Sequence, residues 1–209
     1  MVAKAEKVNR RAQARAFRRQ QLIDATINCI ARKGLGNTTL ADVAREAGLS
    51  QGIVNLHFDS KNNLLNETLR FLAEEYDALF MKTLSEHEDD PARCLKALLE
   101  LDLTPAVCDR KKLSVWFAFW GEVKAVPTYR QICTARDRKC DEIRVHLVEQ
   151  IIRQGNYRAL DAKVIADALS ALTDGQWLSC QVNPKDFDRG AARDGIIVLL
   201  KSVFPNHYS

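Results

Sequence analysis

The sequence has few residues that interrupt regular structure, and it has no long apolar run. Its 209 residues include only nine glycines and five prolines, too few for long linkers or low-complexity segments. No stretch approaches the roughly 20 apolar residues of a membrane span, and no secretory signal is recognisable. No segment alternates apolar and polar residues in the way that a half-buried strand does. These absences argue against a membrane protein or a β-sheet protein and predict a helical, cytoplasmic one.

Cysteine and histidine are present, but not in the arrangements that metal sites and enzymes use. The six cysteines are scattered without a Cys-x-x-Cys pair, which predicts buried small side chains in a reducing compartment. The four histidines and the acidic pair Asp89-Asp90 show no spacing that would join a nucleophile, a base and an orienting group. We therefore predict no metal, no cofactor and no enzymatic activity. One alternative stays open, because Cys133 and Cys140 would share a helix face near several arginines, which can favour a redox-active thiolate.

Positive charge is concentrated at the N-terminal end of the chain. The net charge is +4, of which residues 1–60 carry +5 and the remaining residues −1. Within residues 1–19, seven lysines or arginines oppose only Glu6, and such an arm binds phosphate without reading base sequence. Arg15 and Arg18 are the candidate contacts, since they lead into an amphipathic helix predicted over residues 20–34. A solubilising tail or a targeting peptide is the alternative reading of this arm.

Residues 38–58, TTLADVAREAGLSQGIVNLHF, have the spacing of a helix-turn-helix. Thr38 and Thr39 can cap a helix that runs to about Ala47, Gly48 supplies the positive φ of a tight turn, and Ser50 can cap the second helix. That helix would dock through its apolar residues, Ile53, Val54 and Phe58, and expose its small and polar ones. The predicted DNA contacts in and around it are Thr39, Ser50, Gln51, Gly52, Asn55 and His57. An ordinary helical hairpin with a solvated face is the alternative.

Beyond residue 60 the apolar residues recur at helical spacing throughout. The run from Ser60 to about His87 predicts one long helix, and Lys61 at its positively charged start can hold a phosphate. A solvated lysine is the alternative there. Further breaks are predicted near residues 89–91, 104–105, 126–127, 155 and 183–184, where proline or glycine interrupts the pattern.

Large aromatic side chains gather in the second half of the chain. Trp116 and Trp120 are one helical turn apart with Phe119 beside them, so one face presents two indoles and a phenyl ring. Such rings can surround a quaternary ammonium ion, because the ring face attracts positive charge. The complete candidate ligand set is Trp116, Phe119, Trp120, Tyr129, Asp174 and Trp177. The Asp174 carboxylate would offset the charge of the ligand or, as the alternative, pair with an arginine across a subunit boundary. The alternative is that these aromatics are core.

The last two predicted helices, residues 161–182 and 184–204, carry more apolar surface than two helices can hide. Pairing with the same helices of a second copy would bury it in a four-helix interface. A two-fold dimer would also present two DNA-reading helices to half-sites roughly 34 to 36 Å apart, or a multiple of that, on a palindromic operator. The sequence therefore predicts an all-α protein of about nine helices in two domains. Residues 1–60 would form the basic arm and helix-turn-helix DNA-binding domain, and residues 61–209 the helical ligand-binding and dimerisation domain.

The order of these features resembles the TetR-type repressors. The resemblance lies in Lys33-Gly34 at the end of the first helix, Thr39 opening the second, Gly48-Leu49-Ser50 in the turn, Gly52 in the recognition helix, and His57-Phe58 with Ser60-Lys61 after it. One position departs from the pattern, since many members have Tyr where this chain has Asn55. A tyrosine contact to phosphate is therefore not carried over.

A narrower resemblance extends over most of the chain. The segments GIV, KNNLL, WFAFW at 116–120, PTYRQ at 127–131 and DGQWL at 174–178 are similar to the choline-responsive, BetI-type repressors of glycine-betaine synthesis. This implies a repressor whose effector is choline or a related quaternary ammonium compound, and whose targets are genes of betaine synthesis or choline uptake. The alternative is a TetR-type regulator of efflux or metabolism that responds to another lipophilic cation or to thiol oxidation.

Overall fold

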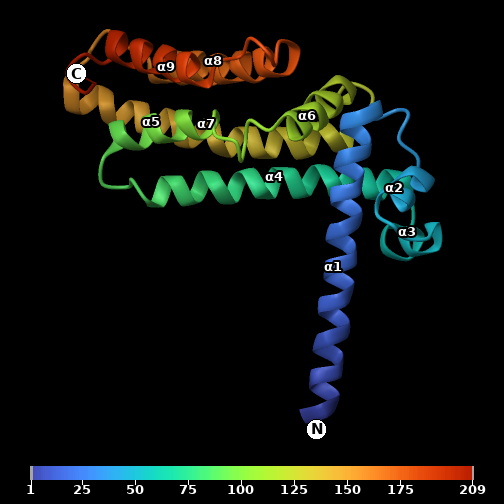
Figure 1. Ribbon diagram of the computed structural model, residues 1–209. Helices are drawn as coiled ribbons and strands as arrows, with labels where there is room; N and C mark the ends of the chain where they lie inside the picture. Colours follow the sequence, from blue (N-terminus) through green and yellow to red (C-terminus); the bar gives the residue numbers. More distant parts are fainter. Residues whose placement is uncertain (1, 209) are drawn as a thin grey trace. The chain divides into compact units, whose positions relative to one another are not determined.

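The protein is helical throughout the part that its structure, a computed structural model, describes: the backbone of residues 2–208 and the side chains of residues 9–208. Nine helices and no strand occur in that part, so the predicted all-α class is confirmed (Figure 1). No helix among the described residues is long and apolar enough to cross a membrane. The helices are α1 (Val2–Lys33), α2 (Leu40–Glu46), α3 (Gln51–Phe58), α4 (Lys61–Ser85), α5 (Pro91–Leu101), α6 (Arg110–Glu122), α7 (Pro127–Gly155), α8 (Ala162–Val182) and α9 (Arg189–Val203).

Two compact units divide the chain. The first comprises Met1–Leu72 and Ser114–Tyr129, and the second comprises Ala73–Leu113 and Arg130–Ser209. Helices α4, α6 and α7 each contribute to both units. The boundary predicted between residues 60 and 61 stays a prediction, and the two units are described separately below.

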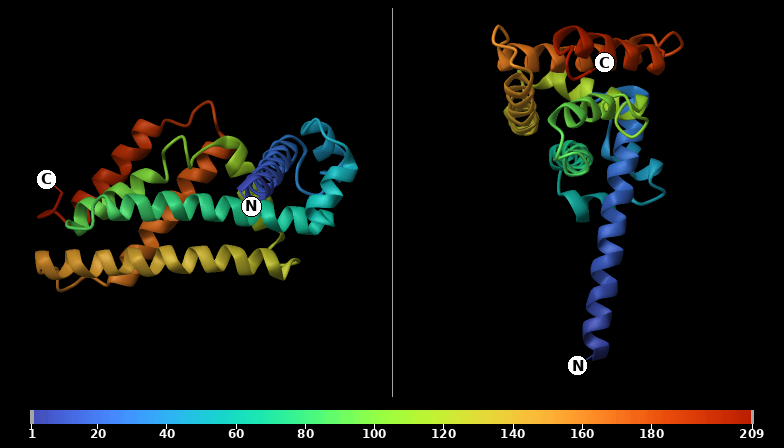
Figure 2. Two further views of the ribbon diagram at one scale, coloured as in Figure 1. Left: turned by 90° about the horizontal axis from the view of Figure 1, so that it is seen from below. Right: turned by 90° about the vertical axis from the view of Figure 1, so that its left-hand side faces the viewer.

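The basic arm of the first unit belongs to α1. A separate arm was expected before a helix at residue 20, but one helix begins at Val2 and runs without a break to Lys33 (Figures 1 and 2). Alanine, arginine and glutamine dominate residues 10–21, and all three favour the helix interior. The arginines of this segment are therefore displayed along a helix. The side chains of Lys4 and Lys7 lie outside the described residues.

Local capping fixes the start of α2 and the turn to α3. The Thr39 hydroxyl accepts a hydrogen bond from the Asp42 backbone N–H at 3.2 Å, and the Asp42 carboxylate accepts one from the Thr39 N–H at 3.0 Å. Gly48 has φ +64°, as the turn requires. Two predicted caps are wrong. Thr38 is buried and donates to the Gly34 carbonyl at 2.8 Å, and Ser50 occupies the cap position of α3 without a side-chain capping bond.

Aspartate caps begin three helices of the second unit. Asp90 precedes α5, Asp161 precedes α8 and Asp188 precedes α9. The side chains of Asp90 and Asp188 each accept two backbone N–H groups of the first turn, and that of Asp161 accepts one. The last helix therefore starts at Arg189, five residues after the predicted start at Pro184, because the Asp188 carboxylate binds the Gly190 N–H at 2.7 Å. Buried leucines of α5 and the buried residues of α8 and α9, among them Leu169, Ile196 and Leu200, belong to the core of this unit.

Candidate DNA-binding face and cation site

Helix α3 has one buried face and one exposed face. Val54 and Phe58 are fully buried, α3 packs against α2, and Arg19 of α1 lies over the Phe58 ring. The exposed residues are Ser50, Gln51, Gly52, Asn55 and Leu56. Four of these five are the predicted polar or small contacts. Leu56 was not predicted, and at 70% exposure it places a large apolar side chain beside Gln51 and Asn55.

The remaining predicted contacts flank this face, but several already have partners. The exposed Thr39 donates its hydroxyl hydrogen to Asp42 at 2.5 Å, and the Lys61 ammonium donates to the Gly36 carbonyl at 3.3 Å. His57 is half-buried. Burial lowers the pKa of His57 below its ordinary value, and the nearby positive charges of Arg15 and Arg19 lower it further. The imidazole therefore takes up a proton less readily than a free histidine, and it lies close to the basic part of α1.

The arginines of α1 divide into exposed and anchored residues. Arg15 and Arg18 are exposed, although Arg18 also donates to Gln21 at 2.7 Å. Arg19 forms an ion pair with Glu67 on α4 and lies over the Phe58 ring at 5.4 Å. Arg15 and Arg18 are thus available to phosphate, whereas Arg19 holds the helices of the first unit together.

The first unit holds four of the predicted ligand residues. Trp116 and Trp120 have ring centroids 6.2 Å apart, inclined at 45°, and Trp120 is the more exposed of the two. Phe119 and Tyr129 are buried, and their centroids lie 4.7 Å apart in an edge-to-face contact. Because Phe119 and Tyr129 use their rings on each other, the core reading fits these two best. Trp120 keeps the more accessible indole.

The second unit holds Trp177 and Asp174. Trp177 is buried against Tyr76, with ring centroids 6.2 Å apart and planes at 87°. Asp174 is exposed as a residue, but partial burial of its carboxyl raises its pKa, and the nearby positive charge of Arg136 opposes the shift. The guanidinium carbon of Arg136 lies 4.8 Å from the Tyr76 centroid and 6.0 Å from that of Trp177. This unit therefore contains an aromatic pair with a cation over both rings. Two members of this group, Tyr76 and Arg136, were not predicted from the sequence.

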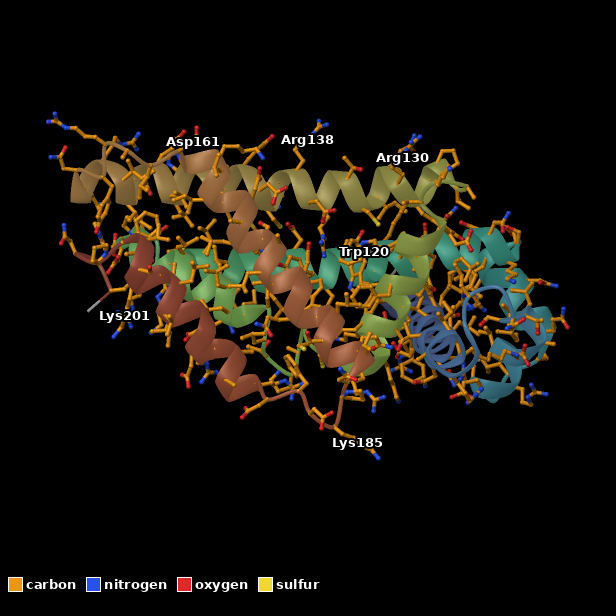
Figure 3. The ribbon with its side chains drawn as sticks, turned by 90° about the horizontal axis from the view of Figure 1, so that it is seen from above. Trp120, Arg130, Arg138, Asp161, Lys185 and Lys201 are labelled. Carbon is orange, nitrogen blue, oxygen red and sulfur yellow. The ribbon has the colours of Figure 1, made fainter. Side chains whose placement is uncertain are left out.

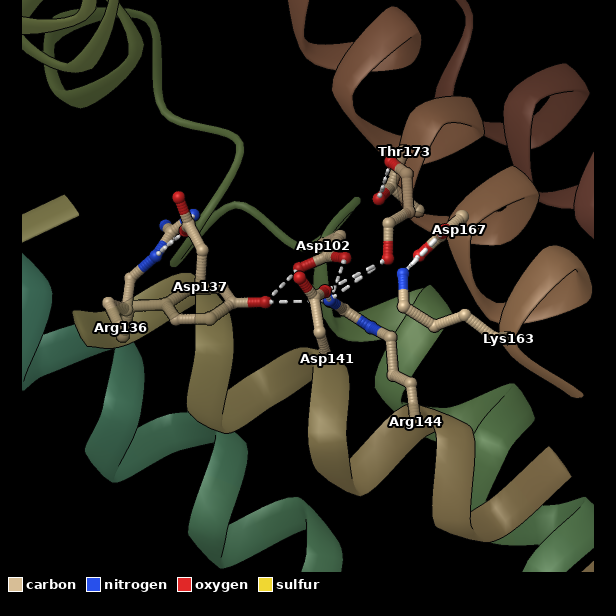
Figure 4. A network of polar contacts seen from close by, with 10 residues as sticks. Asp102, Arg136, Asp137, Asp141, Arg144, Lys163, Asp167 and Thr173 are labelled. Atoms are coloured by element: carbon tan, nitrogen blue, oxygen red, sulfur yellow. Dashed lines mark hydrogen bonds and ion pairs between the residues drawn. The ribbon is translucent and has the colours of Figure 1, made fainter. Parts of the chain in front are cut away.

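A buried carboxylate, Asp102, connects this pair to a polar network (Figure 4). Asp102 is 1% exposed and accepts hydrogen bonds from the Tyr76 hydroxyl at 2.7 Å and from Arg144 at 3.3 Å. Its backbone carbonyl accepts the Trp177 indole N–H at 2.7 Å. Burial raises the pKa of the Asp102 carboxyl, while Arg144 opposes the shift. The sequence offered one weak signal for this site, a single aspartate between the buried Leu101 and Leu103.

Two family descriptions match the chain. Residues 22–68 match the bacterial regulatory proteins of the tetR family, and residues 91–204 match the C-terminal domain of BetI-type transcriptional repressors. The chain belongs to the TetR family, with a C-terminal domain of the BetI type. Proteins of this family are DNA-binding transcriptional regulators and not enzymes.

Relatives of this BetI-type regulator cover most of its length. The transcriptional regulator BetI of Pseudomonas aeruginosa PAO1 is 32% identical over 177 residues, which are 84% of this chain and 87% of the relative. A solved transcriptional regulator from Pseudomonas aeruginosa PAO1 has a TM-score of 0.77 at 25% identity, over 90% of this chain and 88% of that one. A transcriptional regulator from Saccharomonospora viridis, solved in complex with choline, has a TM-score of 0.72 at 26% identity, over 88% of this chain and 95% of that one.

The cysteines of this BetI-type regulator have the properties of core residues. All six are buried, and no group of residues that could hold a metal ion occurs among those that the structure describes. Burial raises the pKa of the Cys140 thiol to about 11, although the positive charges of Arg144 and Arg136 oppose the shift, so little reactive thiolate is present at neutral pH. The side chains of Arg130 and Arg138, both on α7, are exposed and extend outward (Figure 3). These observations weigh against thiol oxidation at Cys140 as the signal.

Proposed function

We propose that this regulator represses genes of betaine synthesis or choline uptake, and that choline or a related quaternary ammonium compound changes its affinity for a palindromic operator. The observation that carries the proposal is the perpendicular Tyr76–Trp177 pair, whose ring faces already hold a cation. Trp177 lies in the segment that matches BetI-type repressors, and the Saccharomonospora viridis relative is solved with choline. A regulator that responds to another lipophilic cation is the second candidate, because the same ring faces would attract it.

The DNA contacts that we propose are those that the first unit exposes. Gln51 and Asn55 lie one turn apart on the exposed face of α3 and carry amide groups, which pair with adenine edges in a major groove. Gly52 between them lets the helix backbone approach the bases closely. Arg15 and Arg18 on α1 would contact phosphates and contribute affinity without sequence preference.

A second copy of the chain is the partner that we propose for α8 and α9. Three residues of the predicted interface, Leu169, Ile196 and Leu200, are buried in the core of their own unit. The exposed apolar and small residues lie on other faces: Val164, Ala168, Ala171, Gly175, Leu178 and Val182 on α8, and Ala191, Gly195 and Val198 on α9. On α8 they recur at intervals of three and four, and their small central members allow another helix to approach closely.

The dimer is tested by light scattering, which we expect to give twice the 23.6 kDa mass of one chain. Val198→Asp places a charge on the α9 side of the proposed interface, at a position that is 66% exposed in the single chain, and is expected to give monomers. Met81→Asp makes the same change at an exposed position on α4 and is expected to leave the dimer intact. A wild-type monomer, or dimers from both variants, would contradict the proposed interface.

The choline response is tested on an operator selected from random duplexes. Choline is expected to change the affinity for this operator, whereas ammonium at equal concentration is not, because it is strongly hydrated and lacks the apolar methyl groups that fit an aromatic site. Trp120→Ala and Trp177→Ala are then titrated with choline by calorimetry, with operator binding as the check on folding. Loss of choline binding in one variant alone identifies the contributing indole. No response to choline, together with a response to another lipophilic cation, would favour the second candidate.

A further inference from the structure

Tyr76 and Trp177 have the geometry of two walls of a cation site. Their planes are perpendicular and their centroids are 6.2 Å apart, so one positive charge can lie within about 6 Å of both rings. The guanidinium of Arg136 occupies this place, at 4.8 Å and 6.0 Å from the two centroids. The second unit therefore fills its own aromatic site with its own cation.

The two rings are fixed independently of Arg136. The Tyr76 hydroxyl donates to the Asp102 carboxylate, and the Trp177 indole N–H donates to the Asp102 backbone carbonyl, both at 2.7 Å. One residue thus sets the position of both rings, and removal of the guanidinium leaves the walls in place. The buried Asp102 carboxylate adds negative charge near the site, where the low dielectric constant strengthens its attraction for any cation.

The Arg136 side chain can take a second position, beside Asp137. Its Nε donates to the carboxylate of the adjacent Asp137 at 2.7 Å, and the Asp137 side chain is 42% exposed. A rotation of the arginine side chain towards solvent can therefore vacate the ring faces while the ion pair with Asp137 is kept. This lowers the cost of exchange, because the guanidinium is never left without a counter-charge.

We propose that the Tyr76–Trp177 pair is the effector site and that Arg136 is its resident cation, which a quaternary ammonium ligand displaces on binding. The inference rests on the proposed choline response. It adds that the effector competes with an internal group, so the apparent affinity is set by the fraction of molecules in which Arg136 has left the rings. It also assigns the first movement on binding to a side chain of α7.

The test is calorimetric titration of the full-length protein with choline chloride. Arg136→Gln removes the internal competitor and is expected to tighten choline binding roughly tenfold, as for a site vacant in about one tenth of wild-type molecules. Arg138→Gln, the same change at an exposed arginine two residues along α7, is expected to leave the affinity unchanged. Trp177→Leu in the Arg136→Gln background is expected to abolish binding. Operator binding by each variant confirms that it is folded.

The outcomes separate this inference from the proposed function. If wild-type protein binds choline and Arg136→Gln binds it equally or more weakly, the displacement is refuted while the choline response stands. If neither protein binds choline although both bind operator, both proposals fail. If Arg136→Gln binds choline more tightly than wild type and Arg138→Gln does not, the displacement is supported.

A measurement on unsubstituted protein covers the case in which Arg136→Gln does not fold. In protein labelled with nitrogen-15 at arginine, the Arg136 Nε–H signal is expected to carry a ring-current shift from Tyr76. Saturating choline is expected to remove that shift and to leave the Arg138 signal in place. An unmoved Arg136 signal in protein saturated with choline would overturn the proposal.

Discussion

The two units carry opposite departures from the usual distribution of side chains. In the first unit the large apolar side chain of Leu56 is 70% exposed on α3, whereas in the second unit the carboxylate of Asp102 is only 1% exposed. Apolar side chains normally lie inside and charged ones outside, because exposed apolar surface and buried charge both cost free energy. Each departure marks the surface or network to which we assign a function in its unit.

The difference lies in what compensates each cost. Leu56 is left largely uncovered within the described residues of the first unit, and we propose that DNA covers it. Asp102 is compensated internally by Tyr76, Arg144 and the network around Trp177. The first unit thus presents its functional side chains on a surface, whereas the second builds its site from contacts that also hold the unit together.

The largest expected effect is a loss of stability when the buried Asp102 of the second unit is replaced. Asp102→Ala leaves the buried Arg144 without its buried counter-charge and the Tyr76 hydroxyl without its acceptor, and we expect a loss of about 3 to 5 kcal/mol in the free energy of unfolding. Urea denaturation followed by circular dichroism measures this loss.

The matched control is an aspartate of the first unit. Asp42 forms ion pairs with Lys33 and Arg45 and completes the capping box of α2. Its side chain is 12% exposed, against 2% for that of Asp102, so water reaches its carboxylate more readily. Asp42→Ala is therefore expected to cost clearly less than Asp102→Ala. Equal losses from the two substitutions would remove the distinction between the units.

A second large effect is expected on DNA affinity. Replacing Arg15 and Arg18 together by alanine is expected to weaken binding to operator and to random duplexes alike, by roughly tenfold or more. The slope of log affinity against log salt is expected to fall by about 0.9 for each phosphate that the protein no longer neutralises. Fluorescence anisotropy over a series of salt concentrations measures both quantities.

Two exposed arginines of the second unit provide the control for charge. Replacing Arg130 and Arg138 by alanine removes the same charge from α7 and is expected to change the salt slope little. Weakening confined to the operator in the Arg15 and Arg18 variant, with an unchanged slope, would show that these arginines read bases instead of phosphates.

Local and non-local contacts explain which features the sequence could predict. The Thr39–Asp42 capping box and the turn at Gly48 depend on residues within a few positions of one another, so spacing alone indicates them. The bond from Trp177 to Asp102 joins residues 75 apart, and no periodicity relates them. Asp174 was chosen as the ligand carboxylate because it is one turn from Trp177, and that role stays a prediction. Asp102, whose backbone carbonyl accepts the indole N–H, could not be chosen in this way.

A smaller effect, on the recognition of thymine in DNA, is expected for the exposed Leu56 of the first unit. An apolar side chain among amides suits the methyl group of thymine, which lies in the major groove. Replacing a contacted thymine by deoxyuridine is expected to weaken wild-type binding about fivefold, close to 1 kcal/mol for one buried methyl group. Leu56→Ala is expected to lose this discrimination without a loss of stability, because the side chain is exposed.

Anisotropy with each operator thymine replaced in turn measures the coupling between the methyl group and Leu56. Gln51→Ala is the control, since it also truncates the exposed face of α3 but is expected to keep the difference between thymine and deoxyuridine. If no thymine position distinguishes wild type from Leu56→Ala, the exposed leucine does not read this base.

The smallest effect concerns His57, which lies between the buried and exposed sides of the first unit. Burial and the charges of Arg15 and Arg19 lower its pKa in the folded protein, whereas in the unfolded chain it has the ordinary value of about 6.5. As the pH falls below about 6.5, the unfolded chain takes up a proton that the folded form resists, so stability decreases. We expect this contribution to stay below about 0.5 kcal/mol, because solvent screens the site.

Urea midpoints at pH 7.5 and 5.5 are expected to differ less in His57→Gln than in wild type. His146→Gln, at an exposed position of α7, is expected to keep the wild-type difference. A pH dependence that is unchanged in His57→Gln would show that this imidazole is not held neutral by its neighbours.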